Sequence, residues 1–358
     1  MNKFVGSVRI VGAGLLGTSI GLALTKQGVD VSITSRSKKS VELAINYGAG
    51  RSATDSDAPT LIVVCVPPDQ TAEIIAQELN KFPQAFVTDV ASVKQSILLS
   101  LEKLGAPIER YVGSHPMAGR ERGGALAGRA DLFLGRPWIV CAHSKSLPAA
   151  TDAVRDLASA LESSVVEINA KDHDRAVALV SHLPQLVASL LASRLIESDS
   201  KDVALAGQGL RDTTRIASSD PDLWLQIFSA NADQVSEVLD AFAADLKEAS
   251  TALGDLSKPE NRATLRQVLS LGNTGVEKIP GKHGTKHSTY AQVIVMIDDQ
   301  PGQLAKLLTD VGEIGINLEE LKLEHSPSAQ IGLVELYIAH DKEQKLISEL
   351  ELRNWRLV

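Results

Sequence analysis

The sequence predicts an α/β protein in which a doubly wound parallel sheet precedes an all-α domain and a small βαββαβ domain. Three observations predict this order. Short apolar, β-rich runs alternate with helix-length segments up to residue 169, leucines at helical spacing follow, and strand-like runs return after residue 289. A chain of 358 residues is also long enough for several domains. We therefore expect domains at 1–169, 170–272 and 289–358, with a linker at 273–288.

The first domain is expected to contain strands that are separated by helical segments. In order, they are VRIVGA (8–13), VDVSIT (29–34), TLIVVCV (60–66), AFVTDV (85–90), RYVGSH (110–115), RPWIVCA (136–142) and SVVEIN (164–169). Strands that alternate with helices indicate parallel βαβ units. Their unbroken apolar character is typical of a sheet that helices cover on both faces.

The second domain is predicted to be helical because apolar residues recur at helical spacing, as at Leu179, Leu183 and Leu186. These helices are too apolar to be fully exposed, so we expect them to pack into a homodimer or against the first domain. The third domain is ferredoxin-like in its βαββαβ order. Its elements are a strand (291–297), a helix (301–315), two strands (316–324 and 330–339), a helix (341–351) and a strand (354–358).

Composition and charge argue against several classes of protein. A net charge of −8 without a basic stripe argues against nucleic-acid binding. No apolar run approaches the length of a membrane span and the chain begins directly in a strand, so we expect neither a membrane segment nor a signal peptide. Cys65 and Cys141 lie in separate apolar runs, which favours a reducing, cytoplasmic location. His283 and His287 in the linker lack supporting ligands, so no metal site is predicted.

The first motif with chemical meaning is VGAGLLGTSIG, where three glycines form G-x-G-x-x-G between a strand and a helix. Gly12 permits the tight turn, Gly14 lets a pyrophosphate approach the backbone, and Gly17 allows helix and strand to pack closely. The helix N-terminus then faces the phosphates. The motif predicts a Rossmann-type dinucleotide site rather than a purely structural turn. Its predicted cofactor contacts are Gly12, Ala13, Gly14, Leu15, Leu16 and Gly17.

The end of the second strand favours NADP over NAD. An NAD enzyme typically carries a carboxylate there for the ribose 2′-hydroxyl. The corresponding stretch, ITSRSKKS (33–40), has none and offers Ser35, Arg36, Ser37 and Lys38, which suit a 2′-phosphate. A solvated loop that accepts either cofactor is the alternative.

Polar and small residues follow the ends of later strands, where a doubly wound sheet binds its ligand. Cys65, Val66 and Pro67 are expected to form the floor beneath the cofactor ribose. Ser92, in TDVASVK, either faces the ligand or caps the following helix. His115, in GSHPMAG, ends the next strand and should project into the same crevice, where imidazole is suited to accept a hydroxyl proton near neutral pH.

The helical domain contributes two further polar clusters. VSHLPQL carries Ser181, His182 and Gln185 around Pro184 in an otherwise apolar helix, and polar groups on such a face need partners. Near a second apolar helix, Arg211 and Arg215 either pair with an internal acid, such as Asp172 or Asp174, or bind the carboxylate of a substrate.

Together these motifs resemble the prephenate and arogenate dehydrogenases of tyrosine biosynthesis over nearly the whole chain. The resemblance rests on VGAGLLG, TDVASVK, GSHPMAG, DHD (172–174), SHLPQ (181–185) and DTTRIASSDPDLW. The last part of the chain, with DDQPGQLAKLL and GINLEEL, resembles an ACT regulatory domain.

The resemblance implies roles for individual residues. His115 would hydrogen-bond the ring hydroxyl of the substrate, Ser92 would contact both that hydroxyl and His115, and Arg215 would bind a substrate carboxylate. His182 would line the pocket. The full set of substrate-binding residues it implies is Arg215, His182, Ser181, Gln185 and Ser114, and an amino-acid effector, tyrosine, would bind the ACT-like domain at Asp299, Gly302 and Asn317.

The residues leave the substrate open between prephenate and arogenate. Some members of the family carry a second histidine where this chain has Gln185, and glutamine cannot pair ionically with a keto acid or an amino acid. The sequence favours prephenate. Reductases of the β-hydroxyacid type are disfavoured because DHDRAVALVSHLPQL (172–186) has no lysine base. A non-catalytic NADP sensor would not need His115, Ser92 and Arg215 together.

Overall fold

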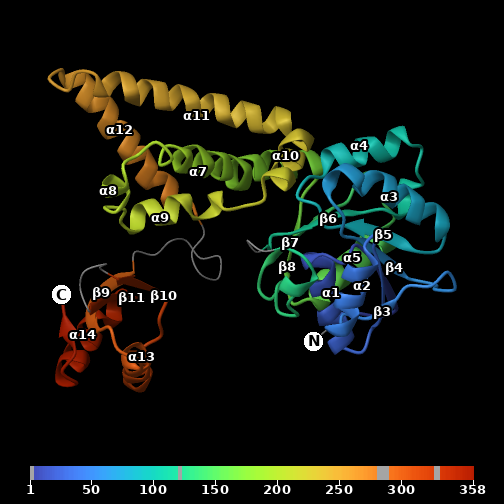
Figure 1. Ribbon diagram of the computed structural model, residues 1–358, viewed down its shortest axis with the longest axis horizontal. Coiled ribbons are helices and arrows are strands. Elements are labelled where there is room, and N and C mark those ends of the chain that lie inside the picture. Colours follow the sequence, from blue (N-terminus) through green and yellow to red (C-terminus); the bar gives the residue numbers. More distant parts are fainter. Residues whose placement is uncertain (1–3, 120–122, 280–289, 326–330) are drawn as a thin grey trace. The chain divides into compact units, whose positions relative to one another are not determined.

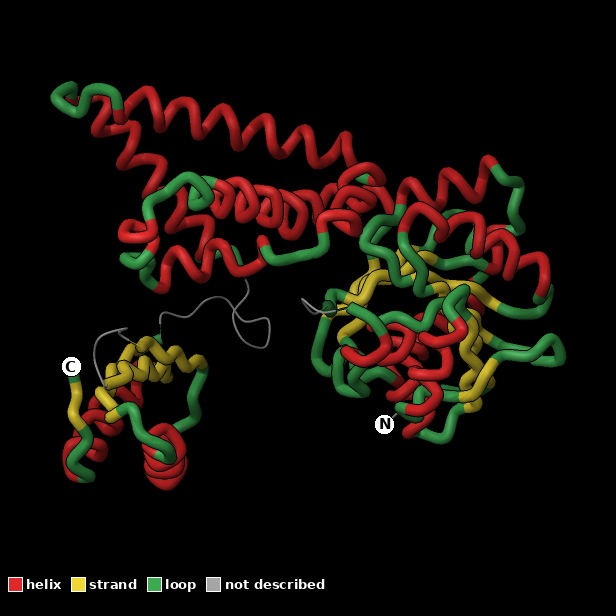
Figure 2. The backbone as a smooth tube through the Cα atoms, in the orientation of Figure 1, coloured by secondary structure: helices red, strands yellow, loops and turns green. Residues whose placement is uncertain are grey.

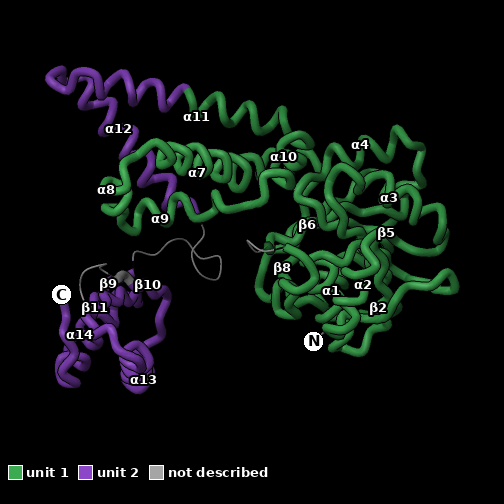
Figure 3. Tube along the Cα trace, in the orientation of Figure 1, with its two compact units in different colours: residues 1–243 green, residues 244–358 purple. Residues whose placement is uncertain are grey.

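The computed structural model describes residues 4–119, 123–279, 290–325 and 331–358. The chain forms two compact units, Met1–Ala243 and Ala244–Val358, each described below by itself (Figures 1 and 3). The predicted linker histidines His283 and His287 lie outside the described residues.

A five-stranded parallel sheet forms the base of the first unit. Its order is β3-β2-β1-β4-β5, with every neighbouring pair parallel. The strands are β1 (Ser7–Val11), β2 (Asp30–Thr34), β3 (Arg51–Ser52), β4 (Leu61–Val64) and β5 (Phe86–Asp89). The short strand β3 was not predicted, because its two exposed residues carry no apolar pattern.

Helices cover both faces of this sheet, which confirms the predicted doubly wound arrangement. Ile10, Leu61 and Val63 pack with Leu24 of α1, whereas Ile62 and its neighbours on the opposite face pack with Ile75 of α3. The helices of this region are α1 (Leu15–Lys26), α2 (Lys38–Asn46), α3 (Pro68–Lys81), α4 (Gln95–Lys103) and α5 (Pro148–Ala160).

The remaining strands of the unit are not all parallel, which corrects the sequence prediction. β6 (Gly113–Pro116) pairs antiparallel with β7 (Pro137–Cys141), and β7 pairs parallel with β8 (Ser164–Glu167). A parallel pair needs a crossover, usually a helix. The described residues between β6 and β7 contain only the short 3-10 helix η2 (Ala125–Ala127), so the chain returns in the opposite direction. A parallel bridge between Val87 and Tyr111 leads from β5 toward β6.

The segment after β8 is helical, as predicted. It contains α6 (Ala170–Val177), the π-helical turn η3 (Ala178–His182), α7 (Leu183–Ser193), α8 (Ser200–Val203), α9 (Gln208–Thr214), η4 (Arg215–Ala217), α10 (Pro221–Ala230), α11 (Ala232–Leu253) and α12 (Pro259–Val276). The first compact unit ends inside α11. Helix α12 continues to Val276, so the first residues of the range 273–288, predicted as a linker, are helical.

One helical stretch, Ala170–Ser193, is long and apolar enough to cross a membrane by length and composition, and 28% of its window is buried. The sequence analysis expected no membrane-spanning segment because it considered only uninterrupted runs of apolar residues. The structure joins α6, η3 and α7 into one stretch that also contains the buried polar residues His173, Asp174 and His182.

The end of the second unit has the predicted ferredoxin-like order. β9 (Ala291–Asp298), α13 (Gln303–Ile314), β10 (Glu320–His325), β11 (Ile331–Ile338), α14 (Glu343–Leu352) and β12 (Arg356–Leu357) follow one another. The antiparallel sheet has the order β10-β11-β9-β12. Its strands are drawn in yellow in Figure 2. Alternate residues of β11 are buried with Leu307 and Leu346 of the two helices, which gives this part its own apolar core.

Candidate active site

The glycine turn between β1 and α1 requires glycine at two positions. Gly12 has a φ of +117°, and a Cβ there would lie 2.2 Å from the carbonyl oxygen of Cys65. A Cβ on Gly17 would lie 2.0 Å from the carbonyl oxygen of Gly12. Gly14, the N-cap of α1, has open space instead, since its Cβ would meet nothing within 4 Å. This arrangement leaves room for a pyrophosphate beside the N-terminus of α1.

A cavity of about 530 Å³ adjoins this turn and brings together most of the predicted cofactor residues. Its lining includes Gly12, Ala13, Gly14, Ser35, Arg36, Cys65, Val66 and Pro67. Leu15, Leu16, Gly17 and Ser37 are not among the lining residues. The hydroxyl of Ser37 caps α2, accepting the backbone N–H of Ser40 at 3.2 Å, and its role as a cofactor contact stays a prediction.

Sequence reasoning missed a buried ion pair in the same cavity. Arg9 of β1 is 5% exposed and donates from Nε to Glu78 Oε2 at 2.9 Å. Its Nη1 has no hydrogen-bond partner among the described residues. Both side chains line the cavity, together with Gln70, Ile74 and Gln77 along α3. An arginine inside the apolar strand VRIVGA was the available signal, because arginine is rarely buried without a partner.

His115 lies at the end of β6 and is linked to the helical segment. Its Nδ1 is 2.9 Å from Nε2 of His173 in α6, and the rings meet edge-on with centroids 5.1 Å apart. Burial, followed by the neighbouring His173, Lys94 and His182, holds the pKa of His115 well below its usual 6.5. The imidazole is therefore neutral near pH 7, as a base must be.

His173 in turn contacts Asp174, a pair that sequence reasoning did not assign to the site. His173 Nδ1 is 2.7 Å from Asp174 Oδ1. Asp174 also accepts the backbone N–H groups of Lys94 and Gln95, at 2.8 and 2.9 Å, and so caps the first turn of α4. His173 and Asp174 are 0% and 2% exposed. The motif DHD was visible in the sequence, but its contact with α4 was not.

A second buried cluster supports the loop that carries Ser92. Asp89 forms an ion pair with Lys94, accepts the backbone N–H of Ala91 at 2.8 Å, and accepts the hydroxyl of Tyr111 at 2.7 Å. Desolvation and Asp89 raise the pKa of Tyr111 well above 10, so it stays a neutral donor. Lys94, not Ser92, is the N-cap of α4, which removes the alternative that Ser92 caps that helix. Ser92 has no hydrogen bond within the described part of the chain.

His182 is buried at the end of the π-helical turn. Its Nδ1 is 3.3 Å from Nδ2 of Asn231, and its ring packs edge-on against Trp224. Its Nε2 is buried without a hydrogen-bond partner among the described residues. Burial lowers its pKa from 6.5 to about 4. Pro184 is tolerated because α7 begins at Leu183, which places the proline in the first turn.

The other predicted substrate residues occupy different surroundings. Gln185 is 5% exposed and makes only long contacts, 3.4 Å each, to Ser189 and Ser219. Ser181 is half-buried in the π-helical turn. Ser114 is wholly buried and donates to the carbonyl oxygen of Asp89 at 2.7 Å; its role as a ligand contact stays a prediction.

Arg215 begins η4 and is exposed. The acids proposed as its internal partners have other contacts: Asp172 pairs with Arg175 at 3.0 Å, and both oxygens of Asp174 accept hydrogen bonds. The predicted effector residues Asp299, Gly302 and Asn317 lie around the start and end of α13. Gly302 has a φ of +90° as the N-cap of that helix. Asn317 donates to Glu319 at 3.2 Å.

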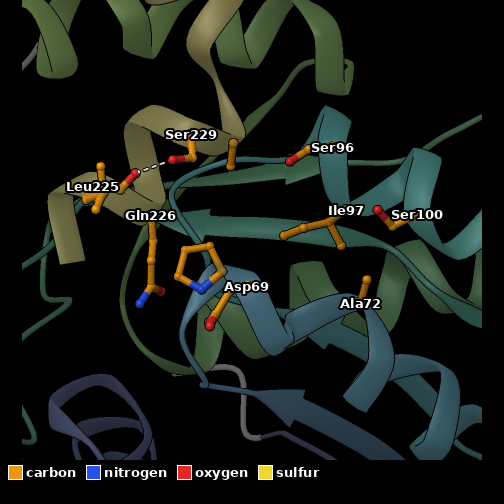
Figure 4. A pocket seen from close by; sticks show the side chains of 10 residues that line it. Asp69, Ala72, Ser96, Ile97, Ser100, Leu225, Gln226 and Ser229 are labelled. Atoms are coloured by element: carbon orange, nitrogen blue, oxygen red, sulfur yellow. Dashed lines mark hydrogen bonds between the residues drawn. The ribbon is translucent and has the colours of Figure 1, made fainter. Parts of the chain in front are cut away.

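A second cavity, of about 440 Å³, contains none of the predicted site residues. Ser96, Ile97 and Ser100 of α4 line one side and Leu225, Gln226 and Ser229 of α10 line the other (Figure 4). The predicted catalytic and cofactor residues lie elsewhere in the unit, at the glycine turn and around the histidine cluster. Within the described residues, no group of three metal-binding side chains is present.

The chain is similar to known proteins in sequence and in fold. One family model, prephenate dehydrogenase, nucleotide-binding domain, matches residues 20–167, and a second, prephenate dehydrogenase, dimerization domain, matches residues 169–268. "Probable prephenate dehydrogenase NovF" of Streptomyces niveus is 34% identical over 355 residues, covering 97% of this chain and 98% of that protein.

Solved structures agree with these matches. Prephenate dehydrogenase from A. aeolicus, in complex with hydroxyphenyl propionate and NAD+, has a TM-score of 0.66 and 26% identity, covering 75% of this chain and 98% of that one. Synechocystis arogenate dehydrogenase has a TM-score of 0.62 and 25% identity, covering 75% and 99%. With its glycine turn, its cofactor cavity and its buried histidine cluster, the chain belongs to the prephenate dehydrogenase family.

Proposed function

We propose that this chain catalyses the oxidative decarboxylation of prephenate to 4-hydroxyphenylpyruvate and carbon dioxide. His115 is the observation that carries the proposal. It is the strand-end imidazole whose pKa lies well below 6.5 and whose Nδ1 is occupied by His173, so Nε2 is left to act on a substrate. The family membership of the chain and the aromatic ligand named for the A. aeolicus structure support the same chemistry.

The proposed mechanism assigns a task to each residue. His115 accepts the proton of the ring hydroxyl as the carbinol carbon loses a hydride. The bound nicotinamide supplies the hydride acceptor. Ser92, in the loop that Asp89 and Lys94 hold, orients the hydroxyl toward His115. The ring then loses its carboxylate as carbon dioxide, and the electron pair of the broken bond makes the ring aromatic.

The remaining substrate contacts are proposed from their burial and chemistry. His182 offers the unpartnered Nε2, and Gln185 offers an uncharged amide with only long contacts. Arg215 supplies a guanidinium suited to a carboxylate. Because Gln185 makes no ionic distinction between a pyruvyl and an alanyl side chain, arogenate is the alternative substrate, and the likeness to the Synechocystis arogenate dehydrogenase is consistent with it.

We further infer a preference for NADP over NAD. The stretch that follows β2 has no carboxylate, and Ser35, Arg36 and Ser40 line the cavity there. A hydroxyl and a guanidinium suit a phosphate better than a ribose hydroxyl. NAD is the alternative, since the A. aeolicus relative is described with NAD+.

A steady-state assay tests the activity directly. Prephenate and arogenate are each offered with NAD and with NADP, and the absorbance of the reduced nicotinamide is followed. Turnover of prephenate is the expected result, with the higher kcat/KM for NADP. Turnover of arogenate alone would identify arogenate as the substrate and leave the proposed role of His115 unchanged. A wild-type protein that turned over neither acid with either cofactor would contradict the proposal.

The assembly and regulation proposed here rest on other parts of the chain. Leu179, Val180 and Leu190 are more than half exposed in the helical segment, whose matching family model is described as a dimerization domain. We propose that the protein is a cytoplasmic homodimer. A monomeric mass measured by light scattering would contradict the dimer. The βαββαβ part is proposed as an ACT-like domain that binds tyrosine at Asp299, Gly302 and Asn317, because its order and sequence suit that role.

A further inference from the structure

A continuous chain of buried hydrogen bonds leads from His115 to the first turn of α4. His115 Nδ1 is 2.9 Å from His173 Nε2, and His173 Nδ1 is 2.7 Å from Asp174 Oδ1. Asp174 ends the chain by accepting the backbone N–H groups of Lys94 and Gln95. His173 and Asp174 are 0% and 2% exposed, so water does not compete for these contacts.

The two backbone donors fix the direction of every bond in the chain. A backbone N–H can only donate, so the Asp174 carboxylate is an acceptor on both of its oxygens. His173 must then donate its Nδ1 proton to Asp174, which leaves Nε2 of a neutral His173 as an acceptor. His115 therefore donates its Nδ1 proton to His173. The same reasoning leaves a lone pair on Nε2 of His115.

We propose that His173 and Asp174 are positioning residues that hold His115 in the tautomer with an unprotonated Nε2. The inference rests on the proposed function, because only a proton-accepting His115 needs this tautomer. In the other tautomer Nε2 would carry a proton and could not accept the one on the substrate hydroxyl. Asp174 also places its negative charge where it stabilises the imidazolium that forms when His115 accepts that proton.

The same carboxylate connects the base to the loop beside it. Asp174 lies in α6 and accepts a backbone hydrogen bond from Lys94 at the start of α4. Helix α4 directly follows the loop that carries Ser92. Asn231, at the end of α10, donates to the backbone carbonyl of Asp174 at 2.8 Å and is 3.3 Å from His182. His115, Ser92 and His182 are thus held with respect to one another through one buried residue.

Imidazole tautomers can be observed directly in the wild-type protein. A long-range proton–nitrogen correlation spectrum of isotope-labelled histidine distinguishes protonated from bare ring nitrogens, and the His115→Asn variant identifies the His115 signals by their loss. We expect His115 to carry its proton on Nδ1, and the His173→Leu variant to lose that bias. A wild-type His115 with its proton on Nε2 would overturn the proposal, even if the His173→Leu variant did not fold.

Kinetics provide the second test. His173→Leu should lower kcat by about 100-fold, the lower end of what a positioned base contributes, and leave the KM of the dinucleotide unchanged. His173→Gln, whose amide can both donate to Asp174 and accept from His115, should recover part of that loss. Asp174→Asn should also lower kcat, whereas Asp172→Asn is the matched control, because Asp172 pairs at the surface with Arg175 at 3.0 Å.

Failure of this inference and failure of the proposed function give different results. A wild-type kcat in His173→Leu, with a folded protein and an active wild type, would overturn the positioning role alone. A wild type that binds NADP but turns over neither cyclohexadienyl acid would overturn the proposed function, while the histidine spectrum would still report the tautomer of His115.

Discussion

Gly12 and Cys65 approach each other so closely that a Cβ on Gly12 would lie 2.2 Å from the Cys65 carbonyl oxygen. This contact joins the end of β1 to the end of β4, beside the cofactor cavity. Backbone hydrogen bonds hold both sides of it: Cys65 N–H donates to the Val11 carbonyl at 2.7 Å, and Gly12 N–H donates to the Thr34 carbonyl at 2.8 Å. Backbone therefore meets backbone at this point of the cavity lining, which tolerates no side chain at residue 12.

Gly12→Ala should destabilise the fold, since it combines a φ of +117° with a backbone clash. We expect a loss of more than about 2 kcal/mol in the free energy of unfolding, measured by chemical denaturation. Gly14→Ala is the matched control: its Cβ meets nothing within 4 Å, so stability should be kept. The affinity for the dinucleotide should nevertheless fall by about 10-fold or more, because the methyl group occupies the space for the pyrophosphate. If Gly12→Ala and Gly14→Ala lowered the free energy of unfolding equally, the distinct roles assigned to the two glycines would be refuted.

His115→Asn should lower kcat by about 10²- to 10⁴-fold, the contribution of a positioned general base, with dinucleotide binding intact. In the wild type, kcat/KM should be independent of pH from neutrality down to 6.5, because the pKa of His115 lies well below that value. The rate should then fall as the pH drops through the pKa of the folded protein, since the protonated imidazole cannot accept a proton. A fall that began above pH 6.5 would argue against His115 as the base.

His182 should make the stability of the fold depend on pH. Its pKa is 6.5 in the unfolded chain and about 4 in the fold, so between these values the unfolded chain binds more protons. The free energy of unfolding should therefore decrease as the pH falls from 6.5 to about 4, by up to about 3 kcal/mol from this group. His182→Phe, which can still pack beside Trp224 and Phe228, should show a correspondingly smaller decrease in denaturant titrations at each pH.

Arg36→Ala should raise the KM for NADP and leave the KM for NAD nearly unchanged. A charge-assisted contact with the 2′-phosphate contributes about 1.5–3 kcal/mol, which corresponds to about 10- to 150-fold in KM. Arg51→Ala is the control, because Arg51 pairs with Asp30 and Asp57 and is not among the cavity-lining residues. An unchanged ratio of the two KM values in Arg36→Ala would remove this residue from the cofactor preference.

Deletion of residues 289–358 should keep turnover and abolish inhibition by tyrosine. The βαββαβ part has a core of its own, which includes Val295, Leu307 and Leu346, so its removal leaves no exposed half-core behind. The measurement is the initial rate with and without tyrosine, for the full chain and the shortened one. Inhibition that persisted in the shortened chain would place the effector in the catalytic unit.

The parts of the fold that were predicted correctly are those marked by a local pattern of apolar residues or glycines in the sequence. The long apolar strands and the glycine turn identify the parallel sheet, and alternation in QIGLVELYIA identifies β11. Local pattern fails where an element is short or where pairing depends on the path of the chain. β3 has only two exposed residues, and the direction of β7 relative to β6 depends on a connection with only a short 3-10 turn among its described residues.

The candidate site shows the same division. Glycine spacing, strand-end position and residue chemistry identify Gly12, Gly14 and His115 from the sequence, because each signal is contained within a few residues. The partners of these residues depend on contacts between distant segments. His115 and His173 are 58 positions apart, and Lys94 and Asp174 are 80 apart.

The sequence by itself therefore determined the fold class and the dinucleotide turn and predicts His115 as the base, since these follow from backbone sterics and side-chain chemistry. Only the tertiary structure decided that Ser37 caps a helix, that Ser114 bonds within the sheet, and that His115 contacts a histidine paired with a buried carboxylate. The physical reason is burial: a polar group removed from water must find a partner. Which partner it finds depends on the packing of elements that are far apart along the chain.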